Sequence, residues 1–423
     1  MKTLQDIYQE RINELLKPEV ILFELIKKRL SDLGIKLSKK QLTQLKTQLA
    51  DFKDGGFSLK FDDKQISKAG FSDIEQFKSI INNLPNDLIV DLKFFEDSLQ
   101  QELPSFIMEL IKEATDIKLS NLKSDLRMIL KYHRKEIERF KKNLLTPWGQ
   151  ALDLLEFLIQ IAVESGEAFN SEFRQLASEK NDLVFDVLTR LHARACQIAS
   201  EILTLLKNGY ADGAHARWRA LYEVVVVAIF VREKGNEIAE RYLCHNVIQS
   251  YNSADDYQKH CLKLGYEKFT DEELQKMENA KNELVEKYGK GYKNLYGWAA
   301  KALGREKPRF KDIEESVGLE YMRPYYNMAC HNVHADSKGI LFKLGLHPES
   351  SDILLAGPSN VGLADPGFLT AIALTQITKI LLTHDPNLDR LVVCNILDEL
   401  TKITNESFLE AHEALEEKIR NST

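Results

Sequence analysis

Apolar residues recur at three- and four-residue intervals along most of the chain, and this spacing predicts helices. The clearest stripe advances by four, three, four and four positions through Leu191, Ala195, Ile198, Ile202 and Leu206. Residues spaced in this way share one face of a helix, and Asn208-Gly209 directly after them is typical of a C-terminal cap. The pattern therefore predicts a helix with one buried face that ends at Asn208-Gly209.

A second helix is predicted over residues 214–233, where apolar side chains soon surround the helix on all sides. A helix of this kind is typical of the centre of a bundle, and Asp212 is the expected N-cap. Its most apolar run, from Val224 to Val231, has eight residues, whereas a bilayer span needs about 20. We therefore expect a buried helix and no membrane anchor.

Further helices follow from local signals. Thr270 to Glu273 matches a capping box and predicts a helix to Tyr288, and two apolar patterns predict helices over residues 368–382 and up to Arg420. Near the N-terminus, Gly55-Gly56 and the alternation of Phe57, Leu59 and Phe61 predict a turn with one small hairpin. The expected fold class is all-α, a multi-helix bundle with an N-terminal helical extension and this one hairpin.

The best candidate for a domain boundary is Thr146-Pro147-Trp148, because the residue before a proline is biased away from helix. We expect residues 1–145 to form a charged N-terminal helical region, a candidate partner-binding or regulatory module. Residues 146–423 are expected to form the bundle core that carries the chemistry.

Composition agrees with a soluble helical protein: 44% of the 423 residues are hydrophobic, 29% are charged, and only 20 are glycine and 10 proline. The net charge of −7 gives no global positive field that would attract nucleic acid. Residues 131–142 are a local exception, with six basic and two acidic side chains. This segment is either a solvated helix face or a patch that contacts phosphate.

The five cysteines are widely spaced and form no C-x-x-C pair, so we expect reduced thiols in a cytoplasmic protein. The first residues are charged and amphipathic, without the apolar stretch of a secretory signal. The chain contains no P-loop, no G-x-G-x-x-G, no G-x-S-x-G and no H-E-x-x-H. Nucleotide hydrolases, Rossmann enzymes and common serine hydrolases therefore lose most of their support.

Two polar constellations are candidates for chemistry. Arg219 and Glu223 stand four apart and share one face of the apolar helix, where charges are costly unless they pair. Such a pair is either a structural clamp or a site. His331 and His334 stand three apart and, on a helix, would lie on one face as an acid and base, as two metal ligands with Asp336, or as ordinary core residues.

Several short segments together resemble the bacterial family known as domain of unknown function 5677, over about residues 150–385. They are Ile202 to Gly209, Gly213-Ala214, Arg217 to Arg219, Leu221 to Glu223, Glu240 to Tyr242, Tyr296 to Ala299 and Tyr325 to His334. The resemblance implies a helical bundle. It maps the recurring Arg-x-x-x-Glu and late His of the family onto Arg219, Glu223 and His334. The chain departs from the family at Ala329-Cys330, where a serine tends to precede the histidine.

The first functional hypothesis is a cytoplasmic helical effector of a bacterial phage-defence or toxin-like system that cleaves RNA without metal or cofactor. His334 and His331 would exchange protons, and Arg219, supported by Arg241, would stabilise the phosphorane. Glu223 would orient Arg219. Tyr325 and Trp298 are the residues we expect to contact the substrate.

Two alternatives stay open. In the first, Arg219, Glu223 and His334 form a buried network that fixes helix register in a non-catalytic sensor or scaffold, and the N-terminal helices bind a protein partner. In the second, His331, His334 and Asp336 serve a metal-dependent hydrolase. A long chain with apolar helices also favours a symmetric dimer.

Overall fold

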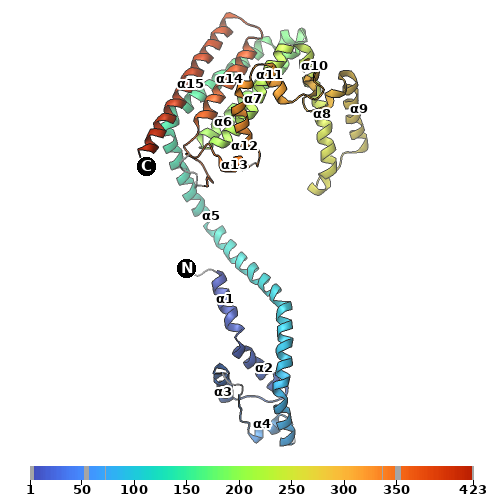
Figure 1. The fold of residues 1–423 in the computed structure, drawn as a ribbon, viewed down its shortest axis with the longest axis vertical. Helices are drawn as coiled ribbons and strands as arrows, with labels where there is room; N and C mark the ends of the chain where they lie inside the picture. Colours follow the sequence, from blue (N-terminus) through green and yellow to red (C-terminus); the bar gives the residue numbers. More distant parts are fainter. Residues whose placement is uncertain (1–3, 52–56, 72, 336, 348–353, 422–423) are drawn as a thin grey trace. The chain divides into compact units, whose positions relative to one another are not determined.

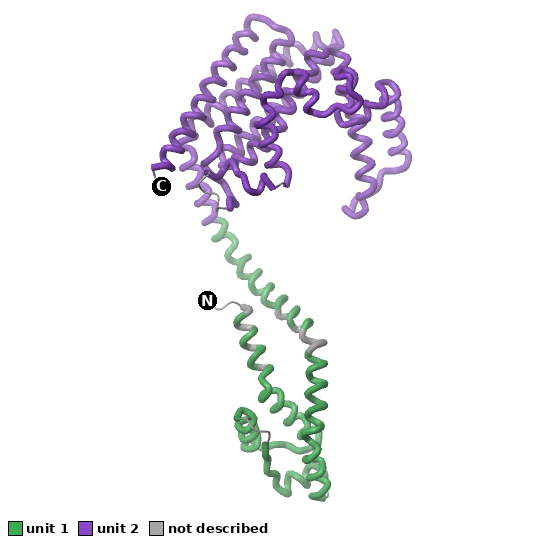
Figure 2. Tube along the Cα trace, in the orientation of Figure 1, with its two compact units in different colours: residues 1–130 green, residues 131–423 purple. Residues whose placement is uncertain are grey.

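The computed structural model describes residues 4–51, 57–71, 73–335, 337–347 and 354–421 (Figure 1). Helices account for nearly all regular structure in these ranges, and none of the described residues lies in a strand. The prediction of an all-α multi-helix protein is confirmed. Contacts divide the chain into unit 1, residues 1–130, and unit 2, residues 131–423 (Figure 2).

Unit 1 contains four helices and the first part of a long fifth one. They are α1 (Leu4–Leu15), α2 (Pro18–Asp32), α3 (Lys39–Ala50), α4 (Asp63–Lys68) and α5 (Ile74–Glu179), of which α5 continues into unit 2. Apolar residues of α2, α3 and α5, with Ile35 from the loop after α2, form a small core: Ile26, Leu30, Ile35, Leu45, Leu49, Phe77, Leu84 and Leu88.

The predicted hairpin is wrong as far as the described residues show it, because residues 57–62 have no regular secondary structure. Phe57, Leu59 and Phe61 pack as partly buried side chains against the core of unit 1. Glutamine side chains of α3 form the hydrogen bonds that a second strand would otherwise make to the main chain of this segment. Gln41, for example, donates to the Lys60 carbonyl at 2.7 Å. Gly55-Gly56 lies outside the described residues.

Unit 2 is a bundle around four helices, α6 (Leu183–Lys207), α7 (Ala211–Lys234), α14 (Ala364–Leu382) and α15 (Leu388–Arg420), together with the last part of α5. Two further helices, α8 (Asn236–His260) and α9 (Asp271–Tyr288), pack against each other beside the bundle (Figure 1). The remaining elements are short: η1 (Cys261–Leu264), η2 (Lys290–Lys293), η3 (Gly297–Ala299), α10 (Ala300–Leu303), α11 (Phe310–Ser316), η4 (Glu320–Met322), α12 (Arg323–His331) and α13 (Ser337–Leu341).

Several local signals produce the elements that they predict. The helix α6 ends at Lys207, and Gly209 after it has a positive φ of 77°. The Thr270–Glu273 capping box forms at the start of α9. The N-cap prediction for Asp212 is wrong, because this residue lies in the first turn of α7. Its carboxylate instead accepts a hydrogen bond from the Leu344 amide at 2.9 Å.

The predicted helix break at Pro147 is also wrong, because α5 runs through it. Leu144, Trp148, Ala151 and Leu152 lie on one helix face and are at most 1% exposed. Burial of these four side chains offsets the roughly 3 kcal/mol that an interior proline costs a helix. The indole of Trp148 also donates to the Asn360 carbonyl at 2.8 Å. The contact boundary lies at residues 130 and 131, before the boundary that we predicted.

The run from Val224 to Val231 lies inside α7, and most of its side chains are buried in the core of unit 2. This agrees with the prediction of a central helix. Among the described residues, no helix combines the length and the apolar character that a membrane crossing requires. The five cysteines are free thiols.

Candidate functional site

Arg219 and Glu223 form an ion pair on α7, with 2.9 Å between Nη2 and Oε1. Four residues separate them, so they occupy successive turns on one side of the helix. Their side chains are 27% and 31% exposed, so the pair is only partly buried. Most other side chains of the middle of α7 are buried in the core of unit 2, whereas the pair lies on a partly exposed side of the helix.

Tyr326 of α12 closes the pair into a three-membered network. Its hydroxyl donates to Glu223 Oε1 at 2.7 Å and accepts from Arg219 Nη2 at 2.9 Å. Burial raises the pKa of Tyr326, and the neighbouring Glu223 carboxylate raises it further. The hydroxyl therefore stays protonated and donates to the carboxylate.

The Arg219 guanidinium is held in its charged form. Burial works against the charge, but the Tyr326 hydroxyl and the Glu223 carboxylate outweigh it and raise the pKa of Arg219. Its Nε is buried and, within the described residues, meets no hydrogen-bond acceptor. Arg219 Nε can therefore donate a hydrogen bond to a ligand only if the Arg219 side chain moves or the groups that cover this nitrogen are displaced.

A second ion pair lies directly behind Tyr326. Arg323 pairs with Glu314, which is completely buried, and the Tyr222 hydroxyl donates to the same carboxylate at 2.8 Å. The Phe310 ring stacks on Tyr326, with 5.1 Å between ring centroids. The carbon Cζ of Arg323 lies 5.3 Å from the Tyr326 centroid, and Cζ of Arg219 lies 5.0 Å from it. Two guanidinium groups therefore contact the same aromatic ring.

Cys330 lies beside Arg219. It belongs to the Ala329-Cys330 pair, where the sequence differs from the family that it resembles. Burial raises the pKa of its thiol, and Arg219 only partly offsets this. Burial likewise raises the pKa of Tyr296, together with Glu223. Both groups therefore border the Arg219–Glu223 pair as neutral side chains.

The two predicted histidines do not share a helix face, because α12 ends at His331. His331 is half-buried, whereas His334 lies in the following turn with an exposed side chain. The His334 amide donates to the Cys330 carbonyl at 3.0 Å, which fixes this turn. The hydrogen bonds that join the Arg219–Glu223 pair to α12 run to Tyr326, whereas the His334 side chain is exposed.

Arg241 lies in a different cluster from Arg219. Its side chain is 3% exposed, donates to the Trp298 carbonyl at 3.0 Å and lies over the ring of Tyr288. The Trp298 ring packs edge-on against Phe230, 11 positions after Arg219 on α7, which corresponds to about 16 Å along the helix. Arg241 therefore clamps the short helices to α8.

The two residues expected to contact substrate lie in packed surroundings. The Trp298 side chain is 3% exposed and also meets the Tyr242 ring edge-on. The half-buried Tyr325 on α12 packs its ring edge-on against Phe368, with 6.3 Å between centroids. Of the two, only Tyr325 has part of its side chain at the surface.

No group of three or more His, Cys, Asp and Glu residues in the described part of the chain could hold a metal ion. The metal hypothesis rested on His331, His334 and Asp336. Because Asp336 lies outside the described residues, that set of ligands stays a prediction.

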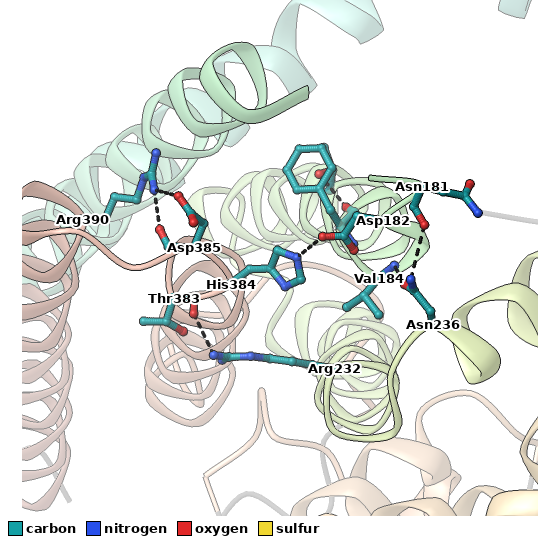
Figure 3. Close-up of polar contacts among 11 residues, drawn as sticks. Asn181, Asp182, Val184, Arg232, Asn236, Thr383, His384, Asp385 and Arg390 are labelled. Carbon is teal, nitrogen blue, oxygen red and sulfur yellow. Dashed lines mark hydrogen bonds and ion pairs between the residues drawn. The ribbon is translucent and has the colours of Figure 1, made fainter. Parts of the chain in front are cut away.

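A second polar cluster, which the sequence did not indicate, joins the turns between α5 and α6, α7 and α8, and α14 and α15 (Figure 3). His384 Nε2 lies 2.7 Å from Asp182 Oδ2, and Arg232 donates to the Thr383 carbonyl at 2.9 Å. The buried Arg390 pairs with Asp385 at 2.7 Å. These side chains connect helix ends to one another, so the cluster fastens the bundle.

The model of a family described as "Family of unknown function (DUF5677)" matches residues 185–351, which confirms the resemblance over that range. The matched range contains Arg219, Glu223, Glu314, Arg323 and Tyr326. No curated protein and no solved structure matches the chain.

Proposed function

We propose that the part of the chain that matches this family of unknown function binds an RNA phosphodiester next to Tyr326. In this proposal the protein is a metal-independent, ribonuclease-like effector of a bacterial phage-defence or toxin-like system. The observation that supports it is the pair of guanidinium groups on one aromatic ring, 5.0 and 5.3 Å from its centroid. Charge-assisted hydrogen bonds from arginine are the usual means of holding phosphate in proteins.

The side chains of Arg219 and Arg323 are 27% and 23% exposed, although Nε of both guanidinium groups and Nη2 of Arg323 are buried. Each is also held from behind by a carboxylate, Glu223 or Glu314, so neither has to be ordered when a phosphate arrives. Preorganised cations of this kind favour the extra negative charge of a phosphorane over that of the ground state.

The proposed reaction needs no metal and no co-reactant. A base takes the proton of a ribose 2′-hydroxyl, the 2′-oxygen bonds to phosphorus, and the bond from phosphorus to the 5′-oxygen breaks. An acid then gives a proton to the departing 5′-oxygen, which leaves a 2′,3′-cyclic phosphate and a 5′-hydroxyl. We assign the proton exchange to His334 and His331 and the stabilisation of the phosphorane to Arg219.

A non-catalytic scaffold is the second candidate, and one observation favours it. Arg219, Glu223 and Tyr326 each contact the other two without any ligand. A closed network of this kind can fix the register of α12 on α7 without chemistry.

Expression in a bacterial host separates the two candidates. We expect the wild type to slow growth and fragment total RNA, including in lysate that contains a metal chelator. Arg219→Ala should abolish both effects, whereas the control Arg217→Ala, two positions away and paired with Glu201, should retain them. Harmless wild-type expression, with a lowered melting temperature only in Arg219→Ala, would favour the scaffold.

His334 supplies an independent test because its side chain is exposed. His334→Ala should keep the melting temperature of the wild type and lose RNA cleavage. Full cleavage by this variant would remove His334 from the proposed mechanism.

A further inference from the structure

A stripe of large apolar side chains is exposed on α5 inside unit 1. Its members are between 37% and 66% exposed: Met108, Ile111, Leu119, Leu122, Leu126 and Ile129. At about 100° per residue, all six fall within roughly a third of the circumference of the helix. Lys112 and Thr115 separate Ile111 from Leu119 on this face, so the continuous apolar part runs from Leu119 to Ile129. An exposed apolar surface of this kind marks an interaction site.

The spacing of the stripe is that of a coiled coil. Thr115, Leu119, Leu122, Leu126 and Ile129 follow one another at intervals of four, three, four and three residues. In heptad terms, Leu119 and Leu126 are a positions, and Thr115, Leu122 and Ile129 are d positions. A second helix with the same spacing would interlock with this face.

Charged residues on both edges of the stripe identify the partner and its direction. Asp116 and Lys123 lie at e positions on one edge, and Lys118 and Asp125 lie at g positions on the other. In an antiparallel pair, e faces e and g faces g. With Leu119 opposite Leu122 of a second copy, Asp116 meets Lys123 of that copy on one edge. On the other edge Lys118 meets Asp125 of that copy, and two-fold symmetry repeats both contacts.

The parallel arrangement lacks this complementarity. In a parallel pair in register, the g position of one helix faces the next e position of the other. Lys118 would then face Lys123 of the second copy, and the repulsion would occur twice. We propose that residues 112–129 of α5 bind the same segment of a second copy of this chain as an antiparallel coiled coil.

The oligomeric state of the full chain tests the surface. Light scattering after size exclusion, repeated over a range of concentrations, should give the mass of a dimer. Leu122→Glu places a carboxylate in the central layer and should raise the dissociation constant by at least about 100-fold. The matched control is Met128→Glu, which lies on the opposite side of the helix, is 66% exposed and should leave the constant unchanged.

The charges test the direction. Lys123→Glu should weaken the antiparallel dimer by about tenfold, and adding Asp116→Lys in the same chain should restore it. In a parallel dimer the carboxylate introduced by Lys123→Glu would instead face Lys118 of the second copy and tighten the dimer. A lower dissociation constant for this variant would therefore overturn the proposal.

Cysteine cross-linking gives a second measure of direction. Thr115→Cys with Leu126→Cys should form a disulfide between copies. Leu126→Cys alone should not, because its counterpart would lie 11 residues away, about 16 Å along the helix. A monomeric wild type, as would result if α1 of the same chain covers the stripe, or a dimer insensitive to Leu122→Glu would overturn the proposal.

Discussion

The Tyr326 hydroxyl donates a 2.7 Å hydrogen bond to Glu223 Oε1 while it accepts one of 2.9 Å from Arg219. One hydroxyl thus connects α12 to both members of an ion pair on α7. Because burial raises the pKa of Tyr326, the donor remains protonated at neutral pH. The position of the Arg219 guanidinium therefore depends on α12 as well as on its own helix.

Removal of this hydroxyl should cost stability without loss of the fold. We expect Tyr326→Phe to lower the free energy of unfolding by about 1–2 kcal/mol, because two hydrogen bonds to partly exposed charged groups are lost. Tyr325→Phe, one position earlier, is the control and should change it by less than about 0.5 kcal/mol. Urea unfolding of the three proteins measures the difference, and equal midpoints would show that the network contributes nothing.

The buried carboxylate of Glu314 should matter more. Glu314→Ala leaves the Arg323 guanidinium without its carboxylate, whereas the Tyr222 hydroxyl keeps the Leu319 carbonyl as an acceptor at 2.8 Å. Loss of one member of a buried ion pair costs about 3–5 kcal/mol, and the partial exposure of Arg323 places the expected cost near the lower end. Thermal unfolding measures this loss of stability. The control is Glu315→Ala: Glu315 is an exposed neighbour paired with Lys311, and its replacement should cost less than about 1 kcal/mol.

Local patterns predicted the elements and the first two site residues. The apolar stripe of α6 and the capping box of α9 involve residues at most four positions apart, so their physics is visible in sequence. The same holds for Arg219 and Glu223, which pair because they occupy successive turns. For the α6 stripe, the α9 capping box and this ion pair, the interacting groups lie within two turns of a helix, and the sequence was sufficient.

The rest of the site depends on tertiary contacts. Tyr326 lies 103 positions after Glu223, and Glu314 lies 92 positions after Tyr222, so no spacing rule connects them. Pro147 shows the opposite error: its local signal is a helix break, but the burial of Trp148 and its neighbours outweighs that signal. Two sequence features indicated this region: an arginine near a tyrosine-rich segment, and the family-like segment from Tyr325 to His334, which contains Tyr326.

Two buried histidines should make the fold sensitive to acid. Burial lowers the pKa of both His192 and His215 to about 4, against a value of about 6.5 in the unfolded chain. Between these values the unfolded state binds a proton that the folded state does not. The free energy of unfolding should therefore be highest above pH 6.5 and fall as the pH decreases to 4, by up to about 1.4 kcal/mol per pH unit for each group.

His215→Phe isolates one of these contributions. Within the described residues, neither ring nitrogen of His215 meets a hydrogen-bond partner, and the ring stacks on Trp218. We expect the phenylalanine to keep this stacking and to make the variant more stable than the wild type, increasingly so from pH 7 to pH 4.5. Urea unfolding at several pH values measures this, and parallel pH profiles for the two proteins would contradict it.

Gly209 should be the least replaceable of the glycines that end helices. Its φ is +77°, and a Cβ there would lie 2.6 Å from the Phe140 ring and 2.7 Å from the Ser359 carbonyl oxygen. Gly265 has nearly the same φ, +78°, with no atom within 4 Å of the added carbon. Gly265→Ala should therefore cost about 1 kcal/mol for the left-handed backbone alone. Gly209→Ala must also displace main chain and ring, so we expect a cost of at least about 3 kcal/mol, measured by thermal unfolding. The Ser359 amide donates a hydrogen bond of 2.9 Å to the Gly209 carbonyl, which holds the main chain at Ser359 in place. Equal costs for the two variants would mean that this main chain moves aside freely and would contradict the prediction.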